Sequence, residues 1–534
     1  MLKNTNMMHI DISLAILNAK IWTANPKQPY AEAIAVCNGY IHDIGTNQQI
    51  KAQITKKTKV IDASGKLIVP GFIDSHLHLI EGGIRLNSLQ LRDVQTKGEF
   101  ISAIANFAKT CKAGEWIIGG DWDHENWGGE LPCRHWIDAL TPENPVWISR
   151  LDGHMALANT ATLTASKFSL DLACSEGEIE IDEQGKASGI FKDRAMDIIA
   201  RHIPKRSKEQ TYKDLEAAMK YLNSLGVTSV HNLSLYEKSD IESLDKARKD
   251  KKLTTRIYTT FPLFAWRELH ERIKKQGTGD KWLKVGGVKG FTDGSLGAST
   301  AAFFDPYKGS ETNRGMMISK PEELFKNVLE ADKHNIQVMI HAIGDKANNT
   351  LLNIYERVIE SNGKKDRRFR IEHAQHLLKE DIPRFAKLNV LVSAQPYHLI
   401  DDGRWAEKLI GAERLQTSFA FKSLLKNNAH VSFGSDWFVA LPNPILGIYA
   451  AVTRKIKGEK SKSFVPEERI TVEQALKAYT IDAAYAGFDE KIKGSLEKGK
   501  LADMVVLDKD ILTIEPEEIQ NTKVEMTILD GKIL

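Results

Sequence analysis

The sequence predicts an α/β protein built on a (β/α)8 TIM-type barrel, with a small β-sandwich formed by the N- and C-terminal segments and an inserted subdomain after strand 1. Apolar strand-like runs alternate with helical patterns through the middle of the chain, which favours a parallel sheet. Eight such units suggest a closed barrel. The runs are Leu67–Leu79, Gly226–Asn232, Thr254–Leu263, Leu283–Gly294, Ile336–Asp345, Arg368–Gln375, Asn389–Pro396 and Ala429–Trp437.

The ends of the chain have a different pattern from the middle. Residues 1–66 contain short β-type runs such as Ser13–Leu17 and Ala33–Val36, and residues 488–534 contain Asp503–Asp508 and Met526–Gly531. Neither end alone can bury a core. We therefore expect both ends to pair into one composite sandwich, with residues 67–487 forming the barrel.

The first interval of the predicted barrel is too long for a single βα unit. Residues 80–225 contain the segment Trp116–Trp122, a turn rich in Trp and Gly over Asp121–Gly129, and a strand-like run at Val146–Ile148. Long insertions are often lids or binding loops. We expect an inserted subdomain here.

Composition excludes several classes of function. The 534 residues carry 73 basic and 70 acidic side chains, so the net charge gives no reason to expect nucleic acid or a membrane surface as a partner. No apolar run approaches the about 18 residues of a membrane span. The four cysteines form no CxxC pair, and the start of the chain has no apolar signal region. A cytoplasmic location is the expectation.

Polar residues stand where the predicted strands end, which in such a barrel is the catalytic edge. Strand one ends with His76 and His78, which alternation places on one face. Neutral histidine is the commonest transition-metal ligand. The later strands add four further groups: Lys289, His341, His373 and Asp436.

Each of these residues also has a structural interpretation. A lone histidine after a strand is usually a hydrogen-bonded structural residue. Asp436 alone is consistent with a helix N-cap or a turn residue, and Lys289 alone is consistent with a solvated lysine. Together, however, six such groups converge on one barrel mouth. This convergence favours a metal site.

With these motifs the chain resembles the amidohydrolase superfamily, in particular the branch of YtcJ-like proteins and N-substituted formamide deformylases (amidohydrolase family 3). The resemblance covers nearly the whole chain. It rests on Pro70–His78, Leu151–Ala156, Lys289–Ala298, His341, Glu372–Gln375, Gly434–Asp436 and Gly494–Asp503.

The resemblance implies a role for each strand-end residue. His76 and His78 would bind a first divalent metal, and His341 and His373 would bind a second or complete a one-metal site. Lys289 stands where some members carry a carboxylated bridging lysine. The N and O ligands suit zinc, although Mn, Fe and Co fit the same donors.

Asp436 would bind metal and act as general base. Metal-bound water has a pKa of about 7, so Asp436 can take its proton and pass it to a leaving nitrogen. The resemblance implies a small-molecule amide or N-substituted formamide as substrate. A homodimer is the expected assembly from base rates.

Four further residues are candidates for substrate contact, each with a structural alternative. His154 follows Asp152-Gly153 in a turn, and His231 ends the second predicted strand. Trp122 is a candidate for the wall of a substrate pocket, and its structural alternative is packing in the core of the insertion. Asp293 suits a partner that orients a metal ligand.

Two other functions remain open at this point. The first is a non-catalytic relative used for regulation or assembly, since fold does not imply function. Such a relative typically lacks a ligand, whereas all of them are present here. The second is a metal-dependent lyase, isomerase or esterase on the same scaffold.

Overall fold

The structure, a computed structural model, describes residues 11–150, 155–172, 177–193, 195–233, 238–297 and 299–534. The chain divides into two compact units. One contains Met1–Leu79 together with Met219–Leu534, and the other contains Ile80–Ala218.

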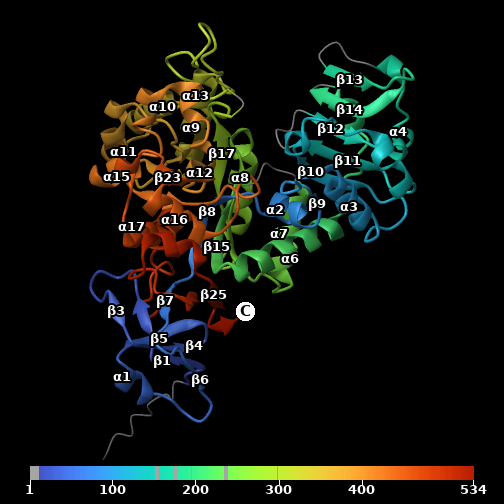
Figure 1. Ribbon diagram of the computed structural model, residues 1–534. Helices are drawn as coiled ribbons and strands as arrows, with labels where there is room; N and C mark the ends of the chain where they lie inside the picture. The colour runs from blue at the N-terminus through green and yellow to red at the C-terminus, as the bar shows by residue number, and fades with distance from the viewer. Residues whose placement is uncertain (1–10, 151–154, 173–176, 194, 234–237, 298) are drawn as a thin grey trace, which may run out of the picture. The chain divides into compact units, whose positions relative to one another are not determined.

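A parallel sheet of eight strands forms the centre of the first unit (Figure 1). Each strand pairs in parallel with its neighbour in the chain, so the predicted parallel α/β barrel is confirmed. The strands are β8 (Phe72–Leu77), β15 (Val227–Asn232), β16 (Arg256–Pro262), β17 (Leu283–Phe291), β18 (Gln337–Ala342), β19 (Arg370–His373), β20 (Leu391–Ala394) and β21 (Val431–Phe433).

The first and last strands of this sheet meet just beyond their carboxyl ends. Leu77 forms a parallel bridge with Trp437. The amide of Asp436 donates to the His76 carbonyl at 2.6 Å, and the amide of His78 donates to the Trp437 carbonyl at 2.6 Å. These bonds bring the edges of the barrel together beside the predicted metal ligands.

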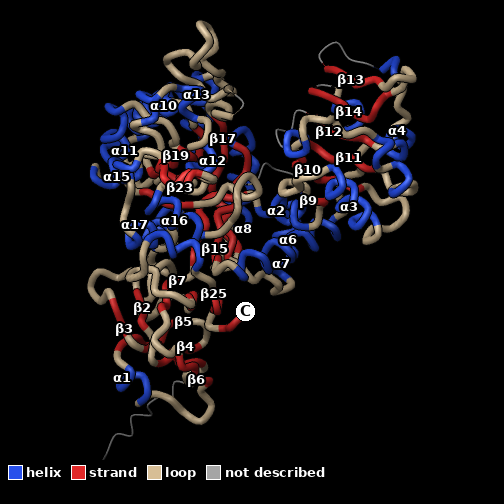
Figure 2. Tube along the Cα trace, in the orientation of Figure 1, coloured by secondary structure: helices blue, strands red, loops and turns tan. Residues whose placement is uncertain are grey.

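Helices lie outside the barrel strands (Figure 2). Helix α10 buries Leu351, Leu352, Tyr355 and Val358, which recur at helical spacing and form its apolar face. Among the described residues no helix is both long enough and apolar enough to cross a bilayer. The helices of this unit include α7 (Lys238–Lys249), α8 (Trp266–Gln276), α9 (Pro321–Lys333), α10 (Asp345–Asn362), α11 (Ile382–Leu388), α16 (Pro444–Thr453), α17 (Val472–Ala478) and α18 (Ile481–Ala486).

Two further sheets in this unit contain strands from the chain ends, and the blue and red strands lie side by side in Figure 1. One sheet has the order β5 (Tyr40–Gly45), β4 (Ala33–Cys37), β1 (Leu14–Leu17), β6 (Lys59–Asp62). The other has the order β26 (Lys532–Ile533), β25 (Val524–Leu529), β24 (Met504–Leu507), β7 (Leu67–Pro70), β2 (Lys20–Trp22), β3 (Tyr30–Ala31).

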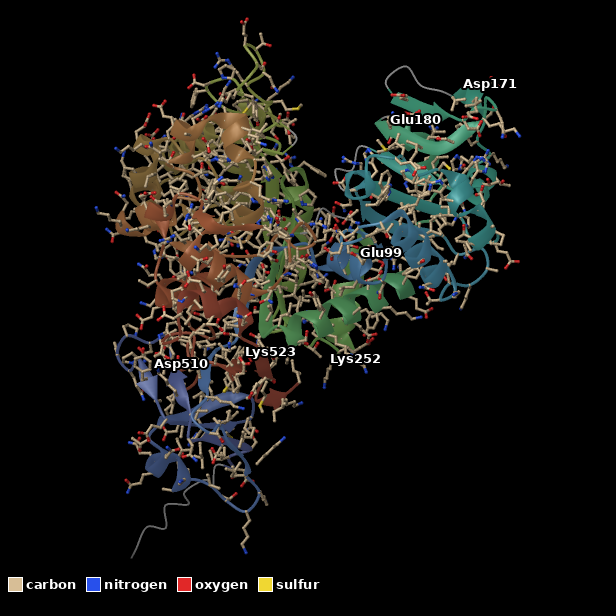
Figure 3. All side chains as sticks on the ribbon, viewed as in Figure 1. Glu99, Asp171, Glu180, Lys252, Asp510 and Lys523 are labelled. Atoms are coloured by element: carbon tan, nitrogen blue, oxygen red, sulfur yellow. The ribbon has the colours of Figure 1, made fainter. Side chains whose placement is uncertain are left out.

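The two sheets share one apolar core that includes Ile16, Ile34, Ile68, Met504 and Ile528. An ion pair between Lys20 and Asp510 also joins the N-terminal part of the chain to the C-terminal part. Asp510 is labelled in Figure 3. Residues from both ends therefore contribute to the same core.

The prediction of one continuous first strand over Leu67–Leu79 is wrong in its extent. The chain forms β7 and then β8, which belong to different sheets. The break falls at Gly71, whose amide donates to the Asp503 carbonyl at 2.9 Å. A Cβ there would lie 2.2 Å from the Thr228 hydroxyl, so only glycine permits this close crossing.

The second unit, Ile80–Ala218, has a sheet of its own. Its core packs Phe100, Ile104, Trp122 and Ile148 together, with helix α3 (Lys97–Ala108) contributing the first two. The strand order is β13 (Gly177–Ile181), β14 (Ala187–Asp193), β12 (Met155–Ala158), β11 (Val146–Arg150), β10 (Ile117–Trp122), β9 (Leu89–Gln90).

Candidate metal centre

The buried carboxylate of Glu372 positions the His76 ring. The Nδ1 atom of His76 lies 2.7 Å from Glu372, and both side chains are at most 1% exposed. Arg370 donates to the same carboxylate from Nε at 2.8 Å and from Nη2 at 3.0 Å. Burial works to raise the pKa of Glu372, but Arg370 and His76 outweigh it and hold that pKa below its usual value. Glu372 is therefore ionised and fixes the His76 ring with Nε2 facing away from it.

His373 is held in the same manner by an amide. Its Nδ1 lies 2.6 Å from the Gln395 side-chain oxygen, which again leaves Nε2 available. The His373 ring centroid lies 4.9 Å from that of His76. Its φ of 74° lies in the left-handed region, which non-glycine residues adopt at a cost and which is common at functional sites.

Asp436 reaches this pair from the loop after β21. Its Oδ1 lies 3.3 Å from His76 Nε2 and 3.1 Å from His78 Nε2. Burial works to raise the pKa of Asp436, and the charge of His76 together with the hydrogen bonds of His76 and His78 lowers that pKa well below the usual value. The carboxylate is thus ionised.

The loop that carries Asp436 approaches β8 unusually closely. A Cβ at Gly434 would lie 2.4 Å from the His76 amide nitrogen. Asp74 fastens the loop by accepting from the Ser435 amide at 3.0 Å and the Ser435 hydroxyl at 2.6 Å. Burial raises the pKa of Asp74 to about 6. Glycine at position 434 and the Asp74 contacts together set the distance between Asp436 and the histidines.

Lys289 and His341 lie on neighbouring strands of the barrel. Lys289 is 3% exposed, and burial lowers its pKa to about 8. His341 Nε2 lies 2.9 Å from the Gly294 carbonyl, so Nδ1 is the nitrogen left for a ligand role. Burial, followed by the Lys289 charge, lowers the pKa of His341 to about 3, which keeps the imidazole in its neutral, metal-binding form.

Asp293 lies beside His341. Its Oδ1 is 3.6 Å from His341 Nε2. It also accepts from the Ala302, Ile343 and Gly344 amides at 2.8 to 3.0 Å. Burial raises the pKa of Asp293 to about 7. These contacts fix the loop after β17 against the end of β18.

The donor set fits a divalent transition metal. Among the described residues, ligand atoms of His76, His373 and Asp436 lie within 4.8 Å of one another, and all three residues are buried. Imidazole nitrogen and carboxylate oxygen are ligands that zinc prefers. His76 and His373 each use Nδ1 for an outer contact, as metal-binding histidines usually do. His78 adds a buried Nδ1 that has no hydrogen-bond partner.

Two predicted substrate contacts lie elsewhere. His231 is 0% exposed inside the barrel, where its Nδ1 meets Arg370 at 2.8 Å and its ring packs on Tyr258. Arg370 opens β19, so His231 faces the interior rather than the mouth. Trp122 is 0% exposed, packs on Phe100 and donates to the Ile148 carbonyl at 3.0 Å. It belongs to the core of the inserted unit, which was the structural alternative. His154 lies outside the described residues.

Sequence reasoning missed several residues of the site. Gln395 directly follows β20 and His398 comes three residues later, yet no group after this seventh strand was predicted. The signal was available, because both follow a buried apolar strand as the other ligands do. Arg370 and Glu372 carried no such signal, since their pairing depends on the barrel interior.

Comparisons with known proteins identify the family of the chain. Residues 59–534 match the amidohydrolase family. The protein LONG AFTER FAR-RED 3 of Arabidopsis thaliana is 40% identical over 506 residues, covering 92% of this chain and 87% of that protein. The putative amidohydrolase YtcJ of Bacillus subtilis is 29% identical, covering 96% and 98%.

Two further relatives carry names that refer to chemistry. An N-substituted formamide deformylase of Arthrobacter pascens is 26% identical, covering 97% of each chain. A crystal structure of an uncharacterized metal-dependent hydrolase from Pyrococcus horikoshii superposes with a TM-score of 0.79 at 28% identity, covering 94% of this chain and 99% of that one.

Proposed function

The chain belongs to the amidohydrolase family, and from this premise we propose that it hydrolyses a carbon–nitrogen bond other than a peptide bond in a small-molecule amide, such as an N-substituted formamide. The coarser class is a metal-dependent hydrolase, to which its structural relative also belongs. The observation that carries the proposal is the convergence of His76, His373 and Asp436 within 4.8 Å.

The proposed ligands of the metal are His76, His78, His341, His373 and Asp436, with Lys289 as a carboxylated bridge in a two-ion form. Zinc is the proposed ion. When bound, it would lower the pKa of water to about 7 and polarise the substrate carbonyl.

Asp436 performs the proton transfers in this proposal. Its Oδ1 is engaged by His76 and His78, so Oδ2 is the oxygen available to accept a proton from the attacking water. The proton then passes to the leaving nitrogen as the carbon–nitrogen bond breaks. Glu372 orients His76, and Gln395 orients His373. The Asp436 carboxylate and the substrate therefore meet in a fixed arrangement.

The first experiment measures metal per chain in protein purified without chelator, for the wild type, His76→Ala and His430→Gln. His430 is the matched control because it precedes β21 at the opposite end of the barrel, stacked on Tyr485. We expect about one or two ions per chain in the wild type and in the control, and a loss in His76→Ala.

The second experiment screens N-substituted formamides, N-acyl amines and cyclic ureas with metal-loaded and chelated enzyme. Hydrolysis that disappears on chelation and returns with zinc would support the proposal. A wild type that is metal-free and binds neither added zinc nor manganese would reject it and favour the non-catalytic alternative. Higher metal content after reconstitution in bicarbonate, in the wild type but not in Lys289→Ala, would support the carboxylated bridge.

A further inference from the structure

His398 lies beside the proposed base without a role in the metal site described above. It opens α12 (His398–Asp402), the helix that follows β20. Its Nε2 lies 3.9 Å from Asp436 Oδ2. Its ring is nearly parallel to that of His373, with an interplanar angle of 17° and a centroid separation of 6.3 Å.

The Nε2 atom of His398 is buried and has no hydrogen-bond partner among the described residues, and the side chain is 15% exposed. The charged group that faces this nitrogen is the Asp436 carboxylate, and its negative charge favours the tautomer that turns an N–H toward it. At 3.9 Å that N–H is too far from Asp436 to form a hydrogen bond. A buried donor without an acceptor is costly unless a ligand supplies one.

The position of His398 relative to the two oxygens of Asp436 indicates which ligand that is. Oδ1 faces His76 and His78, and Oδ2 faces His398. Water that gives its proton to Oδ2 lies on the His398 side, and the carbonyl that this water attacks lies next to it. The N–H of His398 therefore faces the space in which the substrate carbonyl reacts.

We propose that His398 is a catalytic residue whose Nε2–H donates a hydrogen bond to the substrate carbonyl oxygen as that oxygen becomes an oxyanion. This inference rests on the proposed amide hydrolysis. The water oxygen bonds to the carbonyl carbon, the π electron pair moves to the carbonyl oxygen, and Asp436 takes the water proton. The carbon–nitrogen bond then breaks, and the nitrogen receives that proton. His398 keeps its own proton throughout, and the products are a carboxylic acid and an amine.

A role as metal ligand is the alternative for His398. Its nitrogen does not belong to the group of described ligand atoms that lie within 4.8 Å of one another, which contains His76, His373 and Asp436. A ligand and an oxyanion donor differ in one measurable respect. Removal of a ligand lowers the metal content, whereas removal of a donor lowers the rate and leaves the metal in place.

The test uses the full-length metal-loaded protein as wild type, His398→Gln, His398→Ala and the control His430→Gln. We expect unchanged metal per chain in all four. With a formamide that the wild type hydrolyses, kcat should fall about 10²- to 10³-fold in both His398 variants, as for loss of an oxyanion donor. KM should stay within about threefold, since the bond forms in the transition state. Imidazole should restore part of the rate to His398→Ala only.

A binding measurement separates this inference from the proposed function. Acetate is titrated into the same four proteins by calorimetry, because its carboxylate offers an oxyanion without any reaction. We expect weaker acetate binding in the His398 variants and no change in the control. Loss of metal in His398→Gln, or an unchanged kcat, would overturn the proposal. If the wild type hydrolyses no amide, the proposed function fails, and an acetate affinity that is equal in wild type and variants would then overturn the donor role as well.

Discussion

The substitution Glu372→Gln tests whether the buried carboxylate beneath the metal site holds its first ligand. Glu372 accepts three hydrogen bonds, from Arg370 Nε, Arg370 Nη2 and His76 Nδ1, at 2.8, 3.0 and 2.7 Å. Glutamine has one accepting oxygen. With that oxygen toward His76, its NH₂ group faces the Arg370 Nε–H, donor against donor, and with the opposite orientation the His76 contact is lost.

The magnitude follows from burial. Glu372 and Arg370 are both 0% exposed, and removal of one partner of a buried ion pair costs about 3–5 kcal/mol. The retained hydrogen bonds place this substitution toward the lower end of that range. Loss of a carboxylate that orients a ligating histidine typically weakens metal binding about 10- to 100-fold. We expect both effects in Glu372→Gln.

The assay combines zinc affinity, measured by competition with a chelator of known affinity, with urea unfolding of the metal-free protein. Glu322→Gln is the matched control, because Glu322 pairs with Arg357 at 3.0 Å but its side chain is 70% exposed, and exposed pairs contribute little. The reasoning would be refuted by a zinc affinity within about threefold of wild type together with an unchanged unfolding midpoint.

Three further predictions concern the scaffold and the metal. Gly434→Ala should destabilise the protein by about 1–3 kcal/mol and lower its metal content, because the new Cβ would lie 2.4 Å from the His76 amide; Gly98→Ala, with open space around its Cβ, is the control for metal analysis and thermal unfolding. Trp122→Ala should destabilise the inserted unit by about 3–5 kcal/mol and speed its proteolysis, and a proteolysis rate equal to wild type would contradict its place in the core. Zinc at about 100 times its dissociation constant should stabilise the chelated protein by about 2.7 kcal/mol, and calorimetry that shows no shift would argue against a native-state metal site.

The extent of the first strand shows where periodicity fails as a guide. The run Leu67–Leu79 is apolar throughout, because β7 is buried in the sandwich sheet and β8 in the barrel. Burial gives both strands the same composition. Only Pro70 and Gly71 mark the break, and a Pro-Gly pair does not reveal that the chain passes from one sheet to another.

The substrate candidates show a second limit. His231 was placed at the mouth because it stands near the end of its strand, as His76 does. Which way a side chain in a barrel faces depends on the neighbouring strands, and Arg370 from β19 provides the partner of His231 in the interior. His398 follows β20 as the other candidates follow their strands, but its proximity to Asp436, which follows β21, is evident only in the folded chain.

The sequence by itself determined the eight strand-and-helix units, the polar residues at their carboxyl ends and the family to which the chain belongs. These properties are local. Strand periodicity, helix periodicity and the residues at strand ends can each be recognised in a short stretch of sequence. The tertiary structure alone decided which donors meet. Glu372 and Gln395 orient His76 and His373, and Gly434 permits the approach that brings Asp436 to them. Those distances depend on barrel closure between β8 and β21, a contact between residues more than 350 positions apart in the sequence.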